Sequence, residues 1–87
     1  MEPEEMDVVE ILQDLPVEPA WHINTKLETK LTALTRGQRG MVVHRHDQTP
    51  PLYDVEFLDP ATQEPVVLAT LPGDVLRVVE RDTLAIE

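Results

Sequence analysis

Apolar and polar side chains alternate along residues 52–58. In a β-strand, successive side chains point to opposite faces of the sheet. One face would hold Tyr53, Val55 and Phe57, and the other would hold Asp54 and Glu56. The pattern predicts a half-buried strand whose aromatic face lies on the core and whose two carboxylates lie outside.

Four other short runs rich in Val, Ile and Leu predict further strands, because these side chains favour extended backbone. The runs cover residues 7–12, 41–46, 66–71 and 76–79. Prolines and glycines separate them: residues 13–19 are expected to end the first strand, 47–51 and 59–64 to form loops, and 72–75 to form a single 3-10 turn.

This order predicts a mainly β protein, an SH3-like small barrel of about five strands with a long first loop. We expect residues 1–87 to form one domain whose ordered core spans about residues 6–80. Closure into a barrel would remove exposed sheet edges. An open meander with a helix packed on one face is the alternative.

The segment Arg36–Val43 contains two glycines three residues apart, directly before an apolar run. Glycine adopts positive φ without steric cost, so the segment predicts a tight turn that leads into a strand. We expect Gly40 to be the residue with positive φ, in which case a side chain at this position would be destabilising.

Residues 20–35 carry two conflicting patterns. Thr25 and Glu28 match a helix capping box, and the leucines that follow share a helical face: Leu27, Leu31 and Leu34. Residues 23–33 also alternate with the period of a strand. The sequence therefore predicts a long loop that can contain a short helix within residues 25–34, and the structure of residues 20–35 stays open.

The chain has no cysteine, which excludes disulfides, thiolate chemistry and cysteine zinc sites. The first residues are acidic, unlike a signal peptide, and no apolar run reaches the roughly 20 residues that span a membrane. We expect a cytoplasmic protein that does not bind membranes.

The net charge is −10 and is unevenly distributed. Residues 1–19 and 47–87 each carry a net −7, whereas residues 20–46 carry +4. Phosphate backbones repel such a molecule, whereas a basic protein is attracted to it. The composition therefore favours a basic protein partner over nucleic acid.

Four motifs together resemble a known family: the segments 7–16, Arg36–Gly40, Tyr53–Phe57 and Leu71–Leu76. They are similar to the small bacterial family called domain of unknown function 4926, over the whole chain except residues 20–33, which are longer here. The Gly-x-x-Gly-x-Val piece, residues 37–42, also resembles the KOW motif of ribosome- and transcription-associated proteins. The resemblance implies an SH3-like fold and a small partner protein, such as the neutralising member of a bacterial toxin pair. The family has no settled activity, so it implies no functional residues.

Candidate sites for chemistry are sparse. His44 and His46 would share one face of a strand and could supply half of a zinc site, or they could be a solvated strand end. Without serine or cysteine, only threonine or a carboxylate could act as a nucleophile. Asp54 and Glu56 could serve as general acid and base, but the simpler interpretation is that they form the solvent-exposed face of their strand. We predict that the protein is not an enzyme and needs no cofactor.

Binding surfaces are better supported than catalytic ones. Asp54 and Glu56 would form an acidic surface for a basic partner, separate from the basic region that holds Arg36, Arg39 and Arg45. With Lys26 and Lys30, those arginines could instead contact RNA, although no aromatic residues are interleaved with them. Residues 66–71 and 75–79 are apolar on both faces, so either the loop at 20–35 covers them or they form a partner or homodimer interface.

We therefore predict a non-catalytic protein-binding barrel, in its most specific form an antitoxin or immunity-type partner of a basic toxin. A KOW-like module that contacts RNA or the translation machinery is the alternative.

Overall fold

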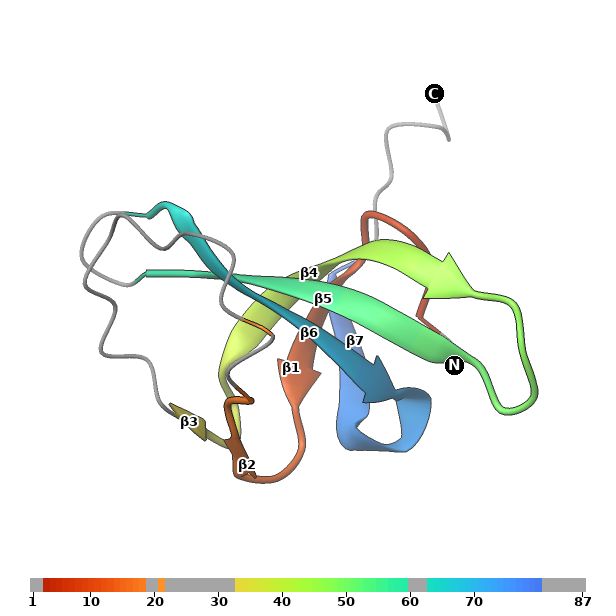
Figure 1. Cartoon of the computed structure of the whole chain (residues 1–87), viewed down its shortest axis with the longest axis horizontal. Coiled ribbons are helices and arrows are strands. Elements are labelled where there is room, and N and C mark those ends of the chain that lie inside the picture. The colour runs from red at the N-terminus through yellow and green to blue at the C-terminus, as the bar shows by residue number, and fades with distance from the viewer. Residues whose placement is uncertain (1–2, 19–20, 22–32, 60–62, 81–87) are drawn as a thin grey trace.

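The computed structural model describes residues 3–18, 21, 33–59 and 63–80. The elements, in chain order, are β1 (Val8–Ile11), β2 (Leu15–Pro16), β3 (Ala33–Leu34), β4 (Arg39–His46), β5 (Leu52–Leu58), β6 (Pro65–Pro72), the 3-10 turn η2 (Gly73–Val75) and β7 (Leu76–Glu80) (Figure 1). The mainly β fold and the 3-10 turn before the last strand are confirmed. β4 begins two residues earlier than predicted.

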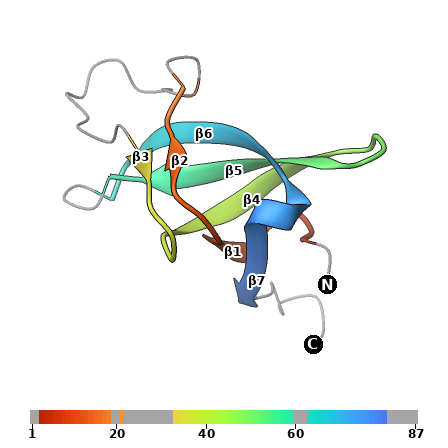
Figure 2. The same ribbon diagram turned by 90° about the horizontal axis from the view of Figure 1, so that it is seen from below.

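Five strands form one antiparallel sheet in the spatial order β6-β5-β4-β1-β7. Figure 2 shows β4, β5 and β6 curving above β1 and β7, with η2 connecting the two outermost strands. Within the described residues β6 and β7 do not pair, so the predicted closure of the barrel is wrong and the curved sheet stays open at this seam. Pro65 and Pro72 bound β6 and lack amide hydrogens, which suits an edge strand.

A second, two-stranded sheet lies outside the predicted pattern. Leu15 and Pro16 pair with Leu34 and Ala33, so residues 13–19 do more than end the first strand. Proline is tolerated because β2 is an edge strand of this small sheet. Ala33 and Leu34 are extended and not helical. The rest of the predicted helix, residues 25–32, lies outside the described residues.

The core contains the apolar face of β5, as the alternation predicts: Tyr53, Val55 and Phe57 are at most 1% exposed. β6 buries two consecutive valines, Val66 and Val67, because its pairing with β5 shifts register there. Such a β-bulge turns neighbouring side chains toward the same side of the sheet.

The chain's own first loop helps to cover this core. Leu34 is fully buried, and Trp21 packs against the core with Leu15 and Val17. Outside the core, β6 keeps only Leu68 as a half-buried apolar residue. The second apolar face predicted for this strand is therefore largely absent, and self-cover is favoured over a partner interface at β6.

The two glycines of the turn have different roles. Gly37 has φ of +89°, and its amide donates to Ile11 O at 2.7 Å. Gly40 does not have positive φ, so that prediction is wrong. Gly40 lies inside β4, where a Cβ would be 2.7 Å from Val55 Cγ1 and 2.8 Å from Glu56 O. Positive φ is needed at Gly37, whereas Gly40 allows β5 to approach closely.

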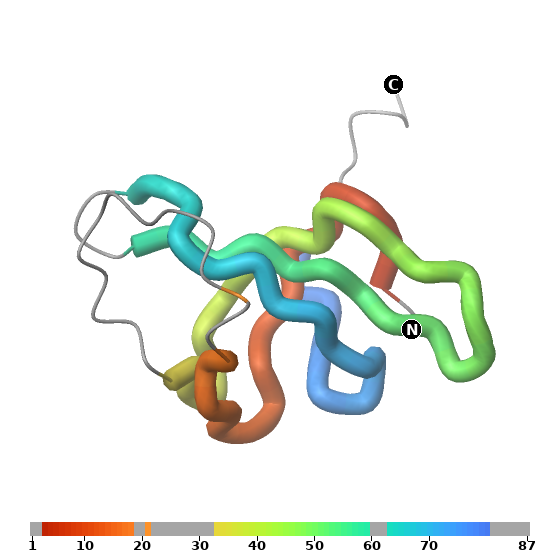
Figure 3. Tube along the Cα trace, in the orientation of Figure 1, coloured from red at the N-terminus to blue at the C-terminus, as the bar shows by residue number. Residues whose placement is uncertain are grey.

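An N-terminal arm, residues 3–7, belongs to the packed structure and runs beside β4 (Figure 3). Asp7 is only 2% exposed, and its Oδ2 accepts a hydrogen bond from the Glu4 amide at 2.9 Å. The Met6 amide donates to Val42 O at 2.7 Å. Pro3, at the start of this arm, is buried as well.

Candidate functional site

The outer face of the sheet carries a row of hydrogen-bonded polar side chains. Asp54 on β5 lies opposite His44 on β4 and Thr70 on β6. Thr70 Oγ1 donates to Asp54 Oδ1 at 2.7 Å, and His46 Nε2 lies 3.0 Å from Asp54 Oδ2. His44 Nδ1 lies 3.5 Å from Glu5 Oε2 of the N-terminal arm. The row thus links β6, β5, β4 and the arm.

These contacts fix the ionisation of Asp54, whose side chain is 17% exposed. Partial burial raises the pKa of this carboxyl, but the hydrogen bonds from Thr70 and His46 and the nearby imidazoles lower it more. The net pKa of Asp54 is below its ordinary value of 3.8. Asp54 is an anion whose two carboxylate oxygens are already engaged by Thr70 and His46.

The two histidines do not converge on a common point. Their rings meet edge to face with centroids 4.7 Å apart, and each ring has its own carboxylate partner. Within the residues described, no group of three or more His, Cys, Asp or Glu side chains could hold a metal ion. The predicted half-site at His44 and His46 therefore gains no further ligand from this part of the chain.

The other predicted site residues fall into three separate places. Glu56 and Arg39 line one hollow on the outer sheet face, with a volume of about 410 Å³. Arg36 is exposed in the turn before β4, where its amide donates to Asp14 Oδ1 at 2.8 Å. Arg45 is near the far end of β4, with Nε 3.6 Å from Asp47 Oδ1. The three arginines do not form one basic patch.

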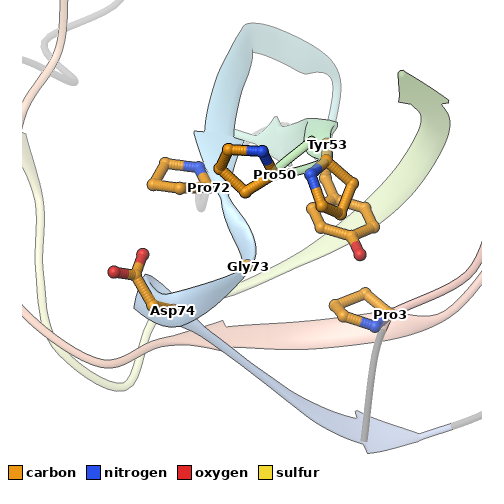
Figure 4. Close-up of a pocket in the computed structure, with 7 residues that line it drawn as sticks. Pro3, Pro50, Tyr53, Pro72, Gly73 and Asp74 are labelled. Carbon is orange, nitrogen blue, oxygen red and sulfur yellow. The ribbon is translucent and has the colours of Figure 1, made fainter. Parts of the chain in front are cut away.

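A second hollow of about 410 Å³ combines segments that are distant in sequence. Its lining consists of Pro3, Pro50, Pro51, Tyr53, Pro72, Gly73 and Asp74. Figure 4 shows Asp74 at one side of this proline groove and Tyr53 and Pro3 at the other. Among the described residues of the lining, Asp74 is the only charged one. The groove can receive an apolar side chain and, at Asp74, a cation.

Sequence reasoning missed the proline groove. Pro50, Pro51 and Pro72 served there as signals for loops and turns, which is the commonest meaning of proline. Only the pairing of Leu52 with Pro72 brings the loop after β4 next to the end of β6. The arm then adds Pro3. The one sequence signal was the density of proline, eight residues of 87, which indicates rigid surface segments but not where they meet.

The chain is thus a small antiparallel β domain with two hollows on its surface. The chain belongs to the family described as domain of unknown function 4926, whose pattern matches residues 5–78. No curated protein and no solved structure matches the chain. Among the described residues, no helix has the length and apolar character needed to cross a membrane.

Proposed function

We propose that this domain is a non-catalytic cytoplasmic module that binds a basic protein partner through the proline groove. The observation that carries the proposal is the composition of the groove: rigid prolines and Tyr53 form the walls, and Asp74 supplies the charge. An antitoxin or immunity-type role against a basic toxin is its most specific form.

The groove suits a protein side chain for two physical reasons. Proline has a fixed φ and little freedom to lose, so binding against four prolines has a small entropic cost. A preformed apolar hollow with one polar group is the usual form of a recognition pocket. An aromatic or aliphatic side chain of the partner would fill the groove, and a lysine or arginine next to it would pair with Asp74.

Charge supports a basic partner at longer range. The chain carries −10, so its field accelerates encounter with a cationic protein and disfavours nucleic acid. The carboxylate of Asp54 contributes less to recognition than its position on the outer face suggests, because His46 and Thr70 already bind it. The proline groove is thus a better contact surface than the Asp54 and Glu56 face.

RNA binding has weaker support. Arg39 and Arg45 lie at opposite ends of β4, separated by roughly 20 Å at about 3.3 Å per residue. Arg45 also lies beside Asp47. The arginines therefore do not provide the continuous cationic track that a phosphate backbone needs.

Peptide binding followed by NMR tests the proposal. The probes are short peptides in which one Trp, Phe, Leu or Pro is flanked by Lys or Arg, with Glu-flanked versions for comparison. We expect the basic peptides to shift the amide signals of Tyr53, Gly73 and Asp74, and the acidic versions to leave them unchanged. Asp74→Lys should weaken binding at least about tenfold. Glu80→Lys, the same charge change at an exposed residue of β7, should have little effect.

Two results would refute the proposal. One is that Asp74→Lys and Glu80→Lys weaken binding equally, which would mean that net charge alone drives it. The other is that the shifted amides lie away from the groove. In both cases, melting of each variant followed by circular dichroism serves as the folding control.

A further inference from the structure

The hollow that contains Arg39 and Glu56 has a chemistry different from that of the proline groove. It is lined by Val8, Met41 and Leu58 together with Arg39, Glu56 and two glutamines, Gln38 and Gln63. Leu58 is 39% exposed, one of the few large apolar side chains so exposed in the described part of the chain. The surface thus has an apolar floor flanked by one cation and one anion.

Neither charge has an ion-pair partner among the described residues. Met41 lies directly opposite Glu56 in the ladder, and Arg39 precedes Met41 by two residues on the same face. Arg39 and Glu56 are therefore diagonal neighbours, and the Cα atoms of such neighbours are about 7–8 Å apart. The two charges lie side by side on the surface and leave each other unpaired.

We propose that this surface, centred on Met41 and Leu58, binds a second copy of the same chain in a two-fold symmetric dimer. In such an interface each copy presents the same patch, so Arg39 of each copy meets Glu56 of the other. A two-fold rotation that brings the two apolar centres together places the cation of each copy opposite the anion of the other. The two copies would then form two reciprocal ion pairs around a shared apolar contact.

Charge distinguishes this occupant from a basic protein. The described lining of the hollow is neutral in sum, since Arg39 offsets Glu56 and the other described residues there are uncharged. A basic partner would gain nothing from contact with Arg39, whereas a second copy would pair both charges. Repulsion between two chains of −10 is screened beyond roughly 8 Å at physiological salt, so the local pairs can decide the contact.

Charge reversal followed by mixing provides a test specific to this arrangement. Sedimentation equilibrium of the wild type, from micromolar to millimolar concentration, should show a dimer that dissociates on dilution. Arg39→Glu and Glu56→Arg should each raise the dissociation constant at least about tenfold, because both reciprocal pairs become like-charge contacts. An equimolar mixture of the two variants should recover the dimer, since each supplies the charge that the other lacks.

Arg36→Glu is the matched control, since it makes the same charge change in the exposed turn outside the hollow and should leave the dimer intact. Circular dichroism melting shows whether each variant is folded. NMR of the wild type provides a further test that needs no variant. The amide signals of Met41, Glu56 and Leu58 should shift as the protein concentration rises. The proposal is overturned if the wild type is monomeric throughout, if the mixture fails to dimerise, or if the concentration-dependent signals lie elsewhere.

Discussion

Substitution of Gly40 by alanine tests how closely β4 and β5 pack. A Cβ at this position would lie 2.7 Å from Val55 Cγ1, 2.8 Å from Glu56 O and 2.8 Å from Phe57 Cε1. Val55 and Phe57 are fully buried, and the oxygen belongs to the backbone of a paired strand, so none of the three can move easily. Real Cβ contacts essentially never fall below 3.0 Å, so the strands must shift apart.

The expected cost is that of overpacking a core, about 1–3 kcal/mol. For a domain of this size, each kcal/mol lowers the melting temperature by roughly 4–8 °C, so a loss near 2 kcal/mol corresponds to about 8–16 °C. Thermal melting followed by circular dichroism at neutral pH measures this shift. In a Val55→Ala background, Gly40→Ala should cost less than in the wild type but still destabilise, because the contacts with Glu56 O and Phe57 Cε1 remain.

Gly37 provides the matched control, because nothing lies within 4 Å of its Cβ position and its φ is +89°. Gly37→Ala should cost about 1–2 kcal/mol from backbone strain, and Gly37→Asn should recover much of that loss, because asparagine tolerates positive φ. At Gly40 the order should reverse, since asparagine is larger than alanine and clashes more. A Gly40→Ala protein that melts with the wild type, or Gly40→Asn that is more stable than Gly40→Ala, would refute the close-packing explanation.

Two further predictions concern the sheet. Because the native pKa of Asp54 is lowered, its ionised form stabilises the fold above the unfolded-state value near 3.8, and this contribution is lost as the pH falls through the lower native value. Asp54→Asn should therefore melt below wild type at neutral pH, with a gap that closes in acid well below pH 3.8; a gap that does not change with pH contradicts the assignment. Val66→Ala and Val67→Ala should each cost roughly 2 kcal/mol, and Leu68→Ala clearly less. If either valine behaves as a surface residue in urea unfolding, β6 has no bulge that buries both.

Local patterns determined most of the strands and the 3-10 turn. The alternation in residues 52–58 has the period of a half-buried strand, and the structure places β5 at the same bounds with its aromatic face on the core. The Pro-Gly pair at 72–73 similarly located η2. These features depend on side-chain direction and backbone freedom within a few residues, which a sequence shows directly.

Contacts between distant segments could not be predicted in this way. β2 and β3 have two residues each, too few to display a period, and they pair across 17 positions of chain. Two glycines three apart predicted a turn, but which one needs positive φ and which needs close packing depends on where β5 lies. The register shift at Val66 also arises from pairing, so the sequence suggested a second apolar face that the bulge largely removes.

The candidate sites also depend partly on local sequence and partly on contacts between distant segments. The sequence by itself placed Asp54 and Glu56 on the outer face of one strand. Only the tertiary structure decided that Asp54 is engaged by His46 and Thr70, and that Glu56 shares a hollow with Arg39. The proline groove and the open seam between β6 and β7 are also tertiary, since each depends on residues brought together by the order of strands. Local sequence limits the conformation of each segment, whereas strand order and register determine which side chains meet.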